Sequence, residues 1–239
     1  MSFRDLGREI GTGNALLYLA SRALGAVTRG QVRLVKYYIT AQPVPDHELT
    51  PPRRGRQIVV EEASSDQVWS LPAERPRHVL EARLRNGGRC LIARKDHAPV
   101  GFQWFTLVDY PEDEVRCVFR LEPRDRCAWD YDIFVSPEWR VQPVFSRLWD
   151  KCNEILRKAG VILALSRINA FNKASRQAHE RIGARVVGWA LFICLGHVQL
   201  ALLSSRPWIH VSFSERHMPV ISVSKMATNA HASTFEAGT

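Results

Sequence analysis

Two carboxylates and one imidazole are the side chains of this sequence best placed for proton transfer. Asp130 and Asp132 lie two residues apart in Ala128–Val135, whose alternating apolar residues predict a strand. Because side chains alternate across a strand, we expect the two carboxylates to share one face. Either could act as a general base if burial raises its pKa, and a protonated His179 could donate a proton near pH 7. The competing interpretations are solvated or hairpin-paired aspartates and an exposed histidine.

The segment from Asp132 to Ala184 contains the elements that would position these groups. Apolar periodicity predicts a helix at Pro143–Ala159, and an apolar run predicts a buried strand at Val161–Ser166. With the strand before it, this helix makes a β–α–β unit whose two strands are parallel. The N–H groups and the dipole at the start of such a helix attract anions. The sequence therefore predicts an anion-binding turn between the first strand and the helix.

The other segments alternate between helix and strand patterns and suggest three parts. Residues 1–60 hold a basic amphipathic helix, a strand and a Pro-rich loop, residues 61–223 form the main domain, and residues 224–239 form a flexible tail. We expect strands at Gln31–Ala41, Ile58–Glu62, Val115–Leu121, Trp208–Phe213 and Val220–Val223, helices at Arg77–Arg85 and Lys173–Ile182, and hairpins at Arg89–Leu107 and Arg185–Leu203.

Composition limits the partners of the chain. Its 239 residues carry 33 basic and 24 acidic side chains, a net charge of +9. This charge indicates either a polyanionic partner or a solvated basic surface, and we weigh the two about equally. Five cysteines without a CxxC pair favour a reducing compartment, so we expect a cytoplasmic protein. No secretory signal and no run of about 18 apolar residues is present. Nothing indicates a metal site, and no motif for nucleic-acid binding is present.

The segment Asn14–Arg29 predicts an amphipathic helix, with Asn14 as its N-cap and Gly30 as its stop. Over residues 1–60, nine basic residues against four acidic ones give a net charge of +5. A basic amphipathic helix can lie in the interface of an anionic membrane. The alternative, which we weigh slightly higher, is that the apolar stripe packs on the protein's own sheet. The stripe consists of Leu16, Leu19, Ala20, Ala23 and Val27.

Two sequence blocks resemble motifs of the GNAT acyltransferases. Val135–Leu148 (VSPEWRVQPVFSRL) is similar to the acyl-CoA loop of that family, V-x-P-x-x-R-G-x-G-x-G/A-x-x-L, and matches it at Val135, Pro137, Arg140 and Leu148. Asn172–Ala184 resembles N-x-x-A-x-x-x-Y-x-x-x-G-F, with Asn172 and Gly183 at the expected separation. The resemblance spans about residues 89–203. It implies an α/β (α+β) GNAT fold, with a central mixed, mostly antiparallel sheet, splayed parallel strands and flanking helices, here preceded by the N-terminal amphipathic helix.

The chain departs from the family loop at all three glycines, which are Val141, Pro143 and Phe145 here. Glycine lets a phosphate approach the backbone, whereas phenylalanine adds bulk and proline removes a donor. Three interpretations stay open: the pyrophosphate of acyl-CoA binds in a shifted pose, the donor is an acyl-phosphopantetheine on an acidic acyl carrier protein, or the site is inert. The residues that the resemblance places around the donor are Phe134, Val135, Arg140, Val141, Gln142, Val144, Phe145, Asn172, Ser175 and Arg176.

The resemblance also suggests roles and substrates. His179 corresponds to the family's tyrosine that protonates the leaving thiolate, and Asn172 is a helix cap that could also meet the pantetheine amides. The basic N-terminal helix and the altered loop favour work at a membrane, so the leading hypothesis is acyl transfer to a lipid amine such as a sphingoid base, as in bacterial ceramide synthases. This hypothesis places the protein on the inner face of a membrane. The alternatives are a soluble N-acetyltransferase that uses acetyl-CoA and an inactive binding module.

Overall fold

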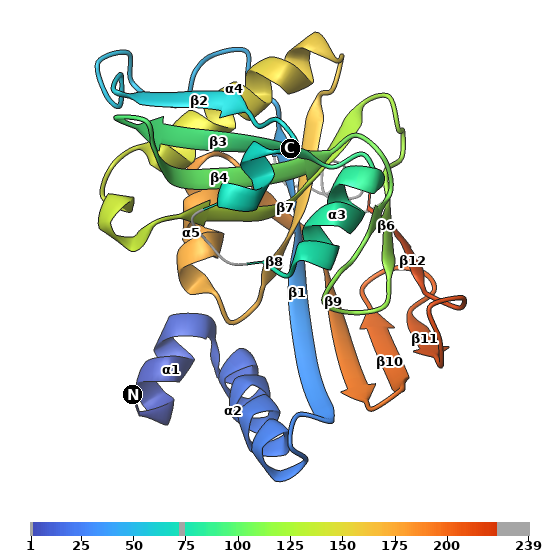
Figure 1. Cartoon of the computed structure of the whole chain (residues 1–239). Coiled ribbons are helices and arrows are strands. Elements are labelled where there is room, and N and C mark those ends of the chain that lie inside the picture. Colours follow the sequence, from blue (N-terminus) through green and yellow to red (C-terminus); the bar gives the residue numbers. More distant parts are fainter. Residues whose placement is uncertain (1, 72–74, 224–239) are drawn as a thin grey trace, which may run out of the picture. The chain divides into compact units, whose positions relative to one another are not determined.

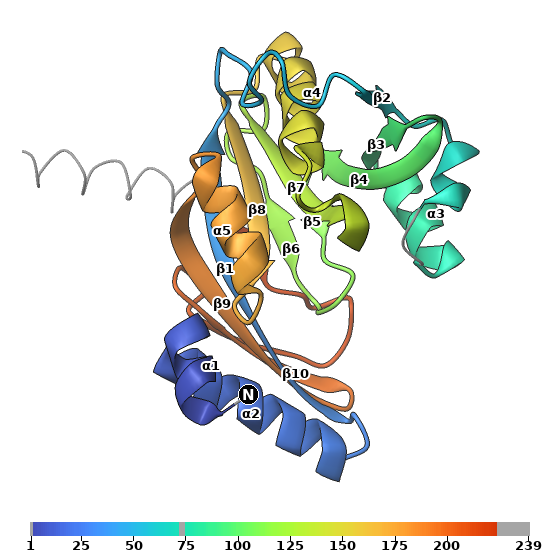
Figure 2. The same cartoon turned by 90° about the vertical axis from the view of Figure 1, so that its left-hand side faces the viewer.

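The computed structural model of the chain describes residues 2–71 and 75–223 (Figures 1 and 2). Contacts divide these residues into two units. Unit 1 comprises residues 2–41, 111–120 and 167–223, and unit 2 comprises residues 42–71, 75–110 and 121–166. The predicted segments 1–60 and 61–223 each contribute to both units, so a domain boundary at residue 60 stays a prediction. The predicted flexible tail, residues 224–239, lies outside the described residues.

Unit 2 is built on a mixed sheet, as the sequence predicts. Its strands lie in the order β8-β7-β4-β3-β2, antiparallel except for the parallel pair of β7 and β8. Their bounds are β2 Ile58–Glu62, β3 Arg89–Lys95, β4 Ala98–Thr106, β7 Cys127–Val135 and β8 Leu163–Asn169, the last three residues of β8 belonging to unit 1. The helical segments are η1 Gln67–Ser70, α3 Arg77–Arg85, η2 Pro137–Trp139 and α4 Val144–Lys158.

Helix α4 follows its predicted apolar stripe closely. Leu148, Cys152 and Leu156 are buried at the predicted spacing of three to four residues. Pro143 lies one position before the helix, where its missing N–H removes no intrahelical bond, and Gly160 ends it at φ 76°. The helix therefore starts and stops where the sequence indicates, and its first turn directly follows the predicted anion-binding loop.

Unit 1 contains an antiparallel sheet in the order β11-β10-β9-β1, which the figures show as one twisted layer (Figure 2). The predicted hairpin turns at Gly196, at φ 56°. A second, small sheet pairs β6 with β12 in parallel. The bounds are β1 Val32–Pro43, β5 Tyr110–Pro111, β6 Val118–Arg120, α5 Lys173–Arg181, β9 Arg185–Leu195, β10 Val198–Leu203, β11 Ile209–Ser212 and β12 Val220–Ser222.

The N-terminus forms two helices, α1 Phe3–Ile10 and α2 Thr12–Val27, where the sequence pattern predicts one (Figure 1). Helix α1 was missed, although Ser2 and Asp5 form a reciprocal capping box at its start. The prediction that Asn14 is an N-cap was wrong. Asn14 lies inside the first turn of α2 and donates from Nδ2 to the Tyr38 hydroxyl at 2.8 Å, because tertiary packing offers it a buried partner.

The apolar stripe of α2 does not pack on the sheet. Leu16, Leu19 and Val27 are 57%, 43% and 84% exposed, whereas the face toward β1 presents Asn14 and Ser21. The prediction that this stripe packs on the protein's own sheet was therefore wrong. Within the described residues no helix is both long enough and apolar enough to span a membrane.

Candidate active site

A β-bulge in β7 separates the two candidate aspartates. Trp104 of β4 pairs with Asp132 and Phe105 pairs with Asp130, so Tyr131 is an extra residue without an opposite partner on β4. Asp130 accepts a hydrogen bond from Gln103, whereas Asp132 lies opposite Trp104, the next residue of β4. Consecutive residues of β4 point to opposite faces, so the aspartates do too. The prediction that they share one face was wrong, because the bulge resets the alternation.

Asp130 lies inside the core of unit 2. It is 4% exposed, and its Oδ1 accepts from Gln103 Nε2 at 2.9 Å. The buried Cys152 of α4 is near enough that the Asp130 charge, after burial itself, raises the pKa of its thiol. Asp130 therefore faces α4.

Asp132 is held by two guanidinium groups. Arg75 donates from Nε and Nη2 at 2.9 Å each, and Arg83 donates from Nη1 at 2.7 Å. The Asp132 side chain is 11% exposed and that of Arg83 is 6% exposed, so this is a largely buried ion pair. To accept a proton from a substrate, Asp132 would first have to release one of these donors. The arrangement suits a carboxylate that positions two cations.

The two arginines are residues that sequence reasoning did not single out. The guanidinium of Arg83 lies 5.5 Å from the ring centre of Trp104 and 5.2 Å from that of Tyr131. Tyr131 stacks in turn on Tyr110, with ring centres 4.2 Å apart. One sequence signal could have identified Arg83: it lies three residues after Leu80, and so on the face of α3 that is buried. Tyr131 itself is buried, at 5% exposed.

The loop between β7 and α4 lacks glycine but carries no backbone strain. None of Val141, Pro143 and Phe145 adopts a positive φ. The first intrahelical bond runs from Arg147 N–H to Pro143 O at 2.9 Å, so the N–H groups of Val144, Phe145 and Ser146 precede the hydrogen-bonded ladder. The N-terminus of α4 thus keeps the positive end of the helix dipole, which attracts anions. Val141, 84% exposed, lies in the loop just before it.

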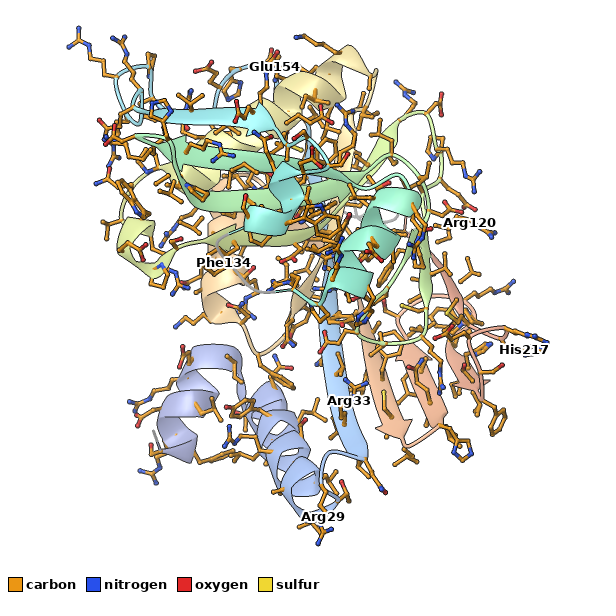
Figure 3. The ribbon with its side chains drawn as sticks, in the orientation of Figure 1. Arg29, Arg33, Arg120, Phe134, Glu154 and His217 are labelled. Carbon is orange, nitrogen blue, oxygen red and sulfur yellow. The ribbon has the colours of Figure 1, made fainter. Side chains whose placement is uncertain are left out.

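Other predicted donor residues of unit 2 surround this loop. Phe134 is half-buried and stacks on Phe102, with ring centres 5.6 Å apart (Figure 3). Arg140 is exposed, and its Nε donates to Val135 O at 3.3 Å, while Gln142 is exposed and Val144 is fully buried. Val144 therefore packs the core, whereas Arg140, Gln142 and the carboxylate of Glu138 reach solvent.

A second cationic segment adjoins the start of α4. Gly55 lies so close to Pro143 that a Cβ at residue 55 would be 2.7 Å from the proline Cγ. The φ of Gly55 is +66°, so glycine is needed there for both conformation and space. Arg54 and Arg56 flank this glycine and are exposed. The Pro-rich loop, predicted only as a connection, thus brings two further arginines to the helix N-terminus.

Helix α5 of unit 1 carries the other predicted donor residues. Asn172 caps it, its Oδ1 accepting from Ser175 N–H at 3.0 Å, as predicted. Arg176 pairs with Glu180 at 3.5 Å and lies 5.8 Å from the ring centre of Tyr38. His179 is 3% exposed, which excludes the exposed-residue interpretation. Its Nδ1 donates to Ser175 O at 2.8 Å, because a carbonyl oxygen can only accept, so the lone pair of the neutral imidazole lies on Nε2.

The parallel pairing of β7 and β8 is short. It covers four residue pairs and ends at Asp130 and Ser166, whereas β7 itself continues to Val135, where the loop begins. Asp130, Asp132 and residues 134–145 belong to unit 2, and residues 172–179 belong to unit 1. The predicted site residues therefore form two groups: the aspartates and the loop in unit 2, and the α5 residues in unit 1.

Comparison with known protein families identifies the family of this chain. The model of the acetyltransferase (GNAT) family matches residues 56–184, which include both aspartates, the loop and α5. No curated protein matches the sequence. The matched span is more than half of the chain, and its mixed α/β fold with flanking helices is the fold class that the sequence predicts.

Several solved structures align with this chain at low sequence identity. A functionally unknown conserved protein from Staphylococcus epidermidis aligns with a TM-score of 0.51 at 13% identity, covering 71% of this chain and 65% of that one. A ribosomal-protein-alanine N-acetyltransferase from Brucella melitensis aligns with a TM-score of 0.42 at 18% identity, covering 54% and 93%. An aminoglycoside acetyltransferase from an uncultured soil sample gives 0.40 at 10% identity, covering 54% and 89%. At these identities the first likeness bears on the fold alone.

Proposed function

Because this chain belongs to the acetyltransferase (GNAT) family, we propose that it transfers an acyl group from a pantetheine thioester to the amine of a long-chain lipid, such as a sphingoid base. Enzymes of this family use acyl-CoA as co-substrate. The observation that carries the proposal of acyl transfer is the family match over residues 56–184, which includes the loop and both aspartates. The lipid amine as acceptor is the more specific part of the proposal, and the basic N-terminal region with its exposed apolar side chains supports it.

The donor is proposed to be held by side chains where the family uses glycine N–H groups. Arg140 lies in the loop, and Arg54 and Arg56 adjoin it through the contact of Gly55 with Pro143. Guanidinium groups bind phosphate oxygens through paired N–H donors, which can replace the donor lost at Pro143. The same basic loop would attract an acidic acyl carrier protein, so the residues present fit either acyl-CoA or a carrier-bound acyl-phosphopantetheine.

The reaction requires two proton movements. The amine nitrogen attacks the thioester carbonyl carbon, the C–S bond breaks, the amine loses a proton and the thiolate gains one. Asp130, Asp132 and His179 are the proposed groups. Nε2 of neutral His179 would take the proton of the amine, and as an imidazolium it would return one to the thiolate. Asp132 would act by orienting Arg75 and Arg83, and Asp130 by holding a water.

The test is an assay for the amide itself. Purified protein is incubated with acyl-CoA or acyl carrier protein, and with a sphingoid base or a water-soluble amine, and products are read by mass spectrometry. Amide on the lipid amine supports the proposal. Transfer only from acetyl-CoA to the soluble amine contradicts the lipid acceptor and favours a soluble N-acetyltransferase, which fits the family match equally well. No amide from any donor favours an inactive binding module.

Variants separate the proposed roles. His179→Gln keeps the size of the side chain but cannot shuttle a proton, so we expect kcat to fall about 100-fold while KM changes little. Asp130→Asn should slow turnover if a water bound there takes the proton. Replacing Arg54 and Arg56 by glutamine should raise KM for the donor without lowering kcat. An unchanged kcat for His179→Gln or Asp130→Asn, or an unchanged KM for the arginine variants, would remove those residues from the proposed mechanism.

A further inference from the structure

Helix α2 packs with its polar face inward. Ser21 donates from Oγ to Leu34 O at 3.2 Å, and Asn14 bonds both Tyr38 and Lys36 of β1. A Cβ at Gly25 would lie 4.0 Å from Val32 O, so the helix also approaches β1 closely at its other end. The opposite face is an exposed apolar stripe about 140° wide at the α-helical angle of 100° per residue. It consists of Leu16, Leu19, Ala20, Ala23, Leu24 and Val27.

The sheet beside α2 also presents apolar side chains outward. Paired residues of adjacent strands point to the same face, so Tyr38 of β1 shares a face with Trp189 of β9. That face continues across the pairs of β9 with β10 and of β10 with β11. Its side chains are half-buried or exposed, whereas the residues between them on β9 and on β10 are buried. They are Trp189, Leu191, Ile193, Leu195, Val198, Leu200, Leu202, Ile209 and Val211.

These two apolar regions lie on the same side of unit 1. Helix α2 touches Tyr38 and Lys36, which point to the same face as Trp189 and Leu191. The helix therefore lies along β1, and β9, β10 and β11 follow on the other side of β1 (Figure 1). We call the α2 stripe together with these sheet residues the outer face of unit 1. Soluble proteins rarely leave such a surface without a partner.

Exposed apolar side chains are concentrated in this unit. Of the eighteen large apolar side chains that are exposed among the described residues, thirteen belong to unit 1 and five to unit 2, although the units are of similar size. Trp208 and Phe213, 57% and 65% exposed, adjoin β11. Aromatic side chains are favoured where a protein enters the boundary between water and lipid.

The charge of the chain is concentrated in the same unit. The described residues of unit 1 include fifteen basic and seven acidic side chains, a net charge of +8, whereas those of unit 2 include seventeen and fifteen, a net of +2. Arg22, on α2, is exposed, and Arg29 lies at the turn from α2 into β1 (Figure 3). A second copy placed on this surface would bring like charges together, whereas an anionic lipid surface complements them.

We propose that the outer face of unit 1 docks the protein on an anionic membrane, with the α2 stripe and the sheet residues entering the lipid interface and the arginines meeting the headgroups. The purpose of this docking rests on the proposed function, since it would bring the enzyme to a lipid amine. The surface itself rests only on exposure, strand register and charge. A docking test and a turnover test can therefore fail independently.

Flotation of the full chain with vesicles tests the proposal. We expect binding to phosphatidylcholine vesicles that contain phosphatidylglycerol and much weaker binding to phosphatidylcholine alone. Val27→Glu on α2 and Val211→Glu on β11 should each weaken binding about ten-fold or more, because each places a carboxylate in the lipid interface. The matched control is Val108→Glu in unit 2, since Val108 is 48% exposed and Val211 is 46% exposed. It should leave binding unchanged.

The charge contribution has its own variants. Replacing Arg22 and Arg29 by glutamine should weaken binding to the anionic vesicles about five-fold for each charge removed. Replacing Arg77 and Arg85, which are exposed residues of unit 2, should have no effect. All of these variants should retain the wild-type rate of acyl transfer to a water-soluble amine, because none touches the residues proposed for catalysis.

Three results would overturn the inference. One is wild-type protein that stays unbound, and another is equal binding to neutral and anionic vesicles. The third is a concentration-dependent dimer in sedimentation velocity that both glutamate variants dissociate, which would make the outer face an interface between copies. If the protein binds vesicles as predicted but forms no amide with any donor, the proposed function fails and the docking surface stands.

Discussion

Replacing Arg83 tests whether the buried ion pair with Asp132 organises unit 2. Arg83→Met keeps the unbranched apolar stem of the side chain and removes the guanidinium. The change deletes the 2.7 Å bond to Asp132 and the contacts of the cation with the rings of Trp104 and Tyr131. Asp132 is then left with Arg75 alone, whose side chain is 32% exposed.

The expected loss follows from how deeply the pair is buried. Removing one partner of a buried ion pair costs about 3–5 kcal/mol, because the other charge stays desolvated. Arg75 still neutralises Asp132, which reduces the loss, whereas the two ring contacts add roughly 0.5–2 kcal/mol each. We therefore expect Arg83→Met to lower the free energy of unfolding by about 3 kcal/mol. Arg75→Met should cost only about 1 kcal/mol, since solvent screens the more exposed partner.

Urea denaturation followed by tryptophan fluorescence measures this loss, because Trp104 and Trp129 are buried in the same unit. The matched control is Arg85→Met on the same helix, where the side chain is 70% exposed and the expected change is within about 0.5 kcal/mol. A double-mutant cycle with Asp132→Asn should give a coupling energy of about 2 kcal/mol. Equal losses for Arg83→Met and Arg85→Met, or a coupling near zero, would refute the reasoning.

Three further predictions concern other buried groups. Arg167 donates two hydrogen bonds, at 2.7 and 2.8 Å, to the carboxylate of the fully buried Glu112. Arg167→Met should therefore destabilise unit 1 by about 3–5 kcal/mol in urea denaturation, and adding Glu112→Gln should restore part of this stability. A Cβ at Gly88 would lie 2.5 Å from the Tyr131 hydroxyl and 2.7 Å from a backbone oxygen, so Gly88→Ala should lower the melting temperature, while no change would mean that the backbone yields. Burial raises the pKa of the Cys127 thiol to about 11, so little of it is thiolate at neutral pH. Its alkylation rate, measured by mass spectrometry, should therefore rise about ten-fold per pH unit up to pH 10. A rate that levels off by pH 9 would contradict this.

Local periodicity was sufficient for most of the elements. The apolar stripe at Pro143–Ala159 predicted α4 within one residue at each end, and Asn172 predicted the cap of α5. The glycines at residues 160 and 196 marked the end of α4 and the turn of the hairpin. These features depend on backbone conformation and on residues a few positions apart, so the sequence contains their causes directly.

The candidate site was predicted in its residues and missed in its geometry. Asp130 and Asp132 were identified, but the bulge at Tyr131 turns them to opposite faces. Arg75 and Arg83 were not identified, because their pairing with Asp132 joins residues 57 and 49 positions apart. A bulge depends on the register with a neighbouring strand, and an ion pair depends on a helix crossing that strand, so neither leaves a local pattern.

Helix α2 and the loop between β7 and α4 also combine features that the sequence shows with features that only the packed fold shows. The sequence by itself determined that α2 is amphipathic, that the loop lacks glycine and that the chain resembles the family whose model matches it. Only the tertiary structure decided which face of α2 is buried, because Asn14 and Ser21 find partners on β1 that compete with packing of the stripe. It also decided that Arg54 and Arg56 adjoin Pro143, because contact between segments distant in sequence depends on the packed fold and not on local preference.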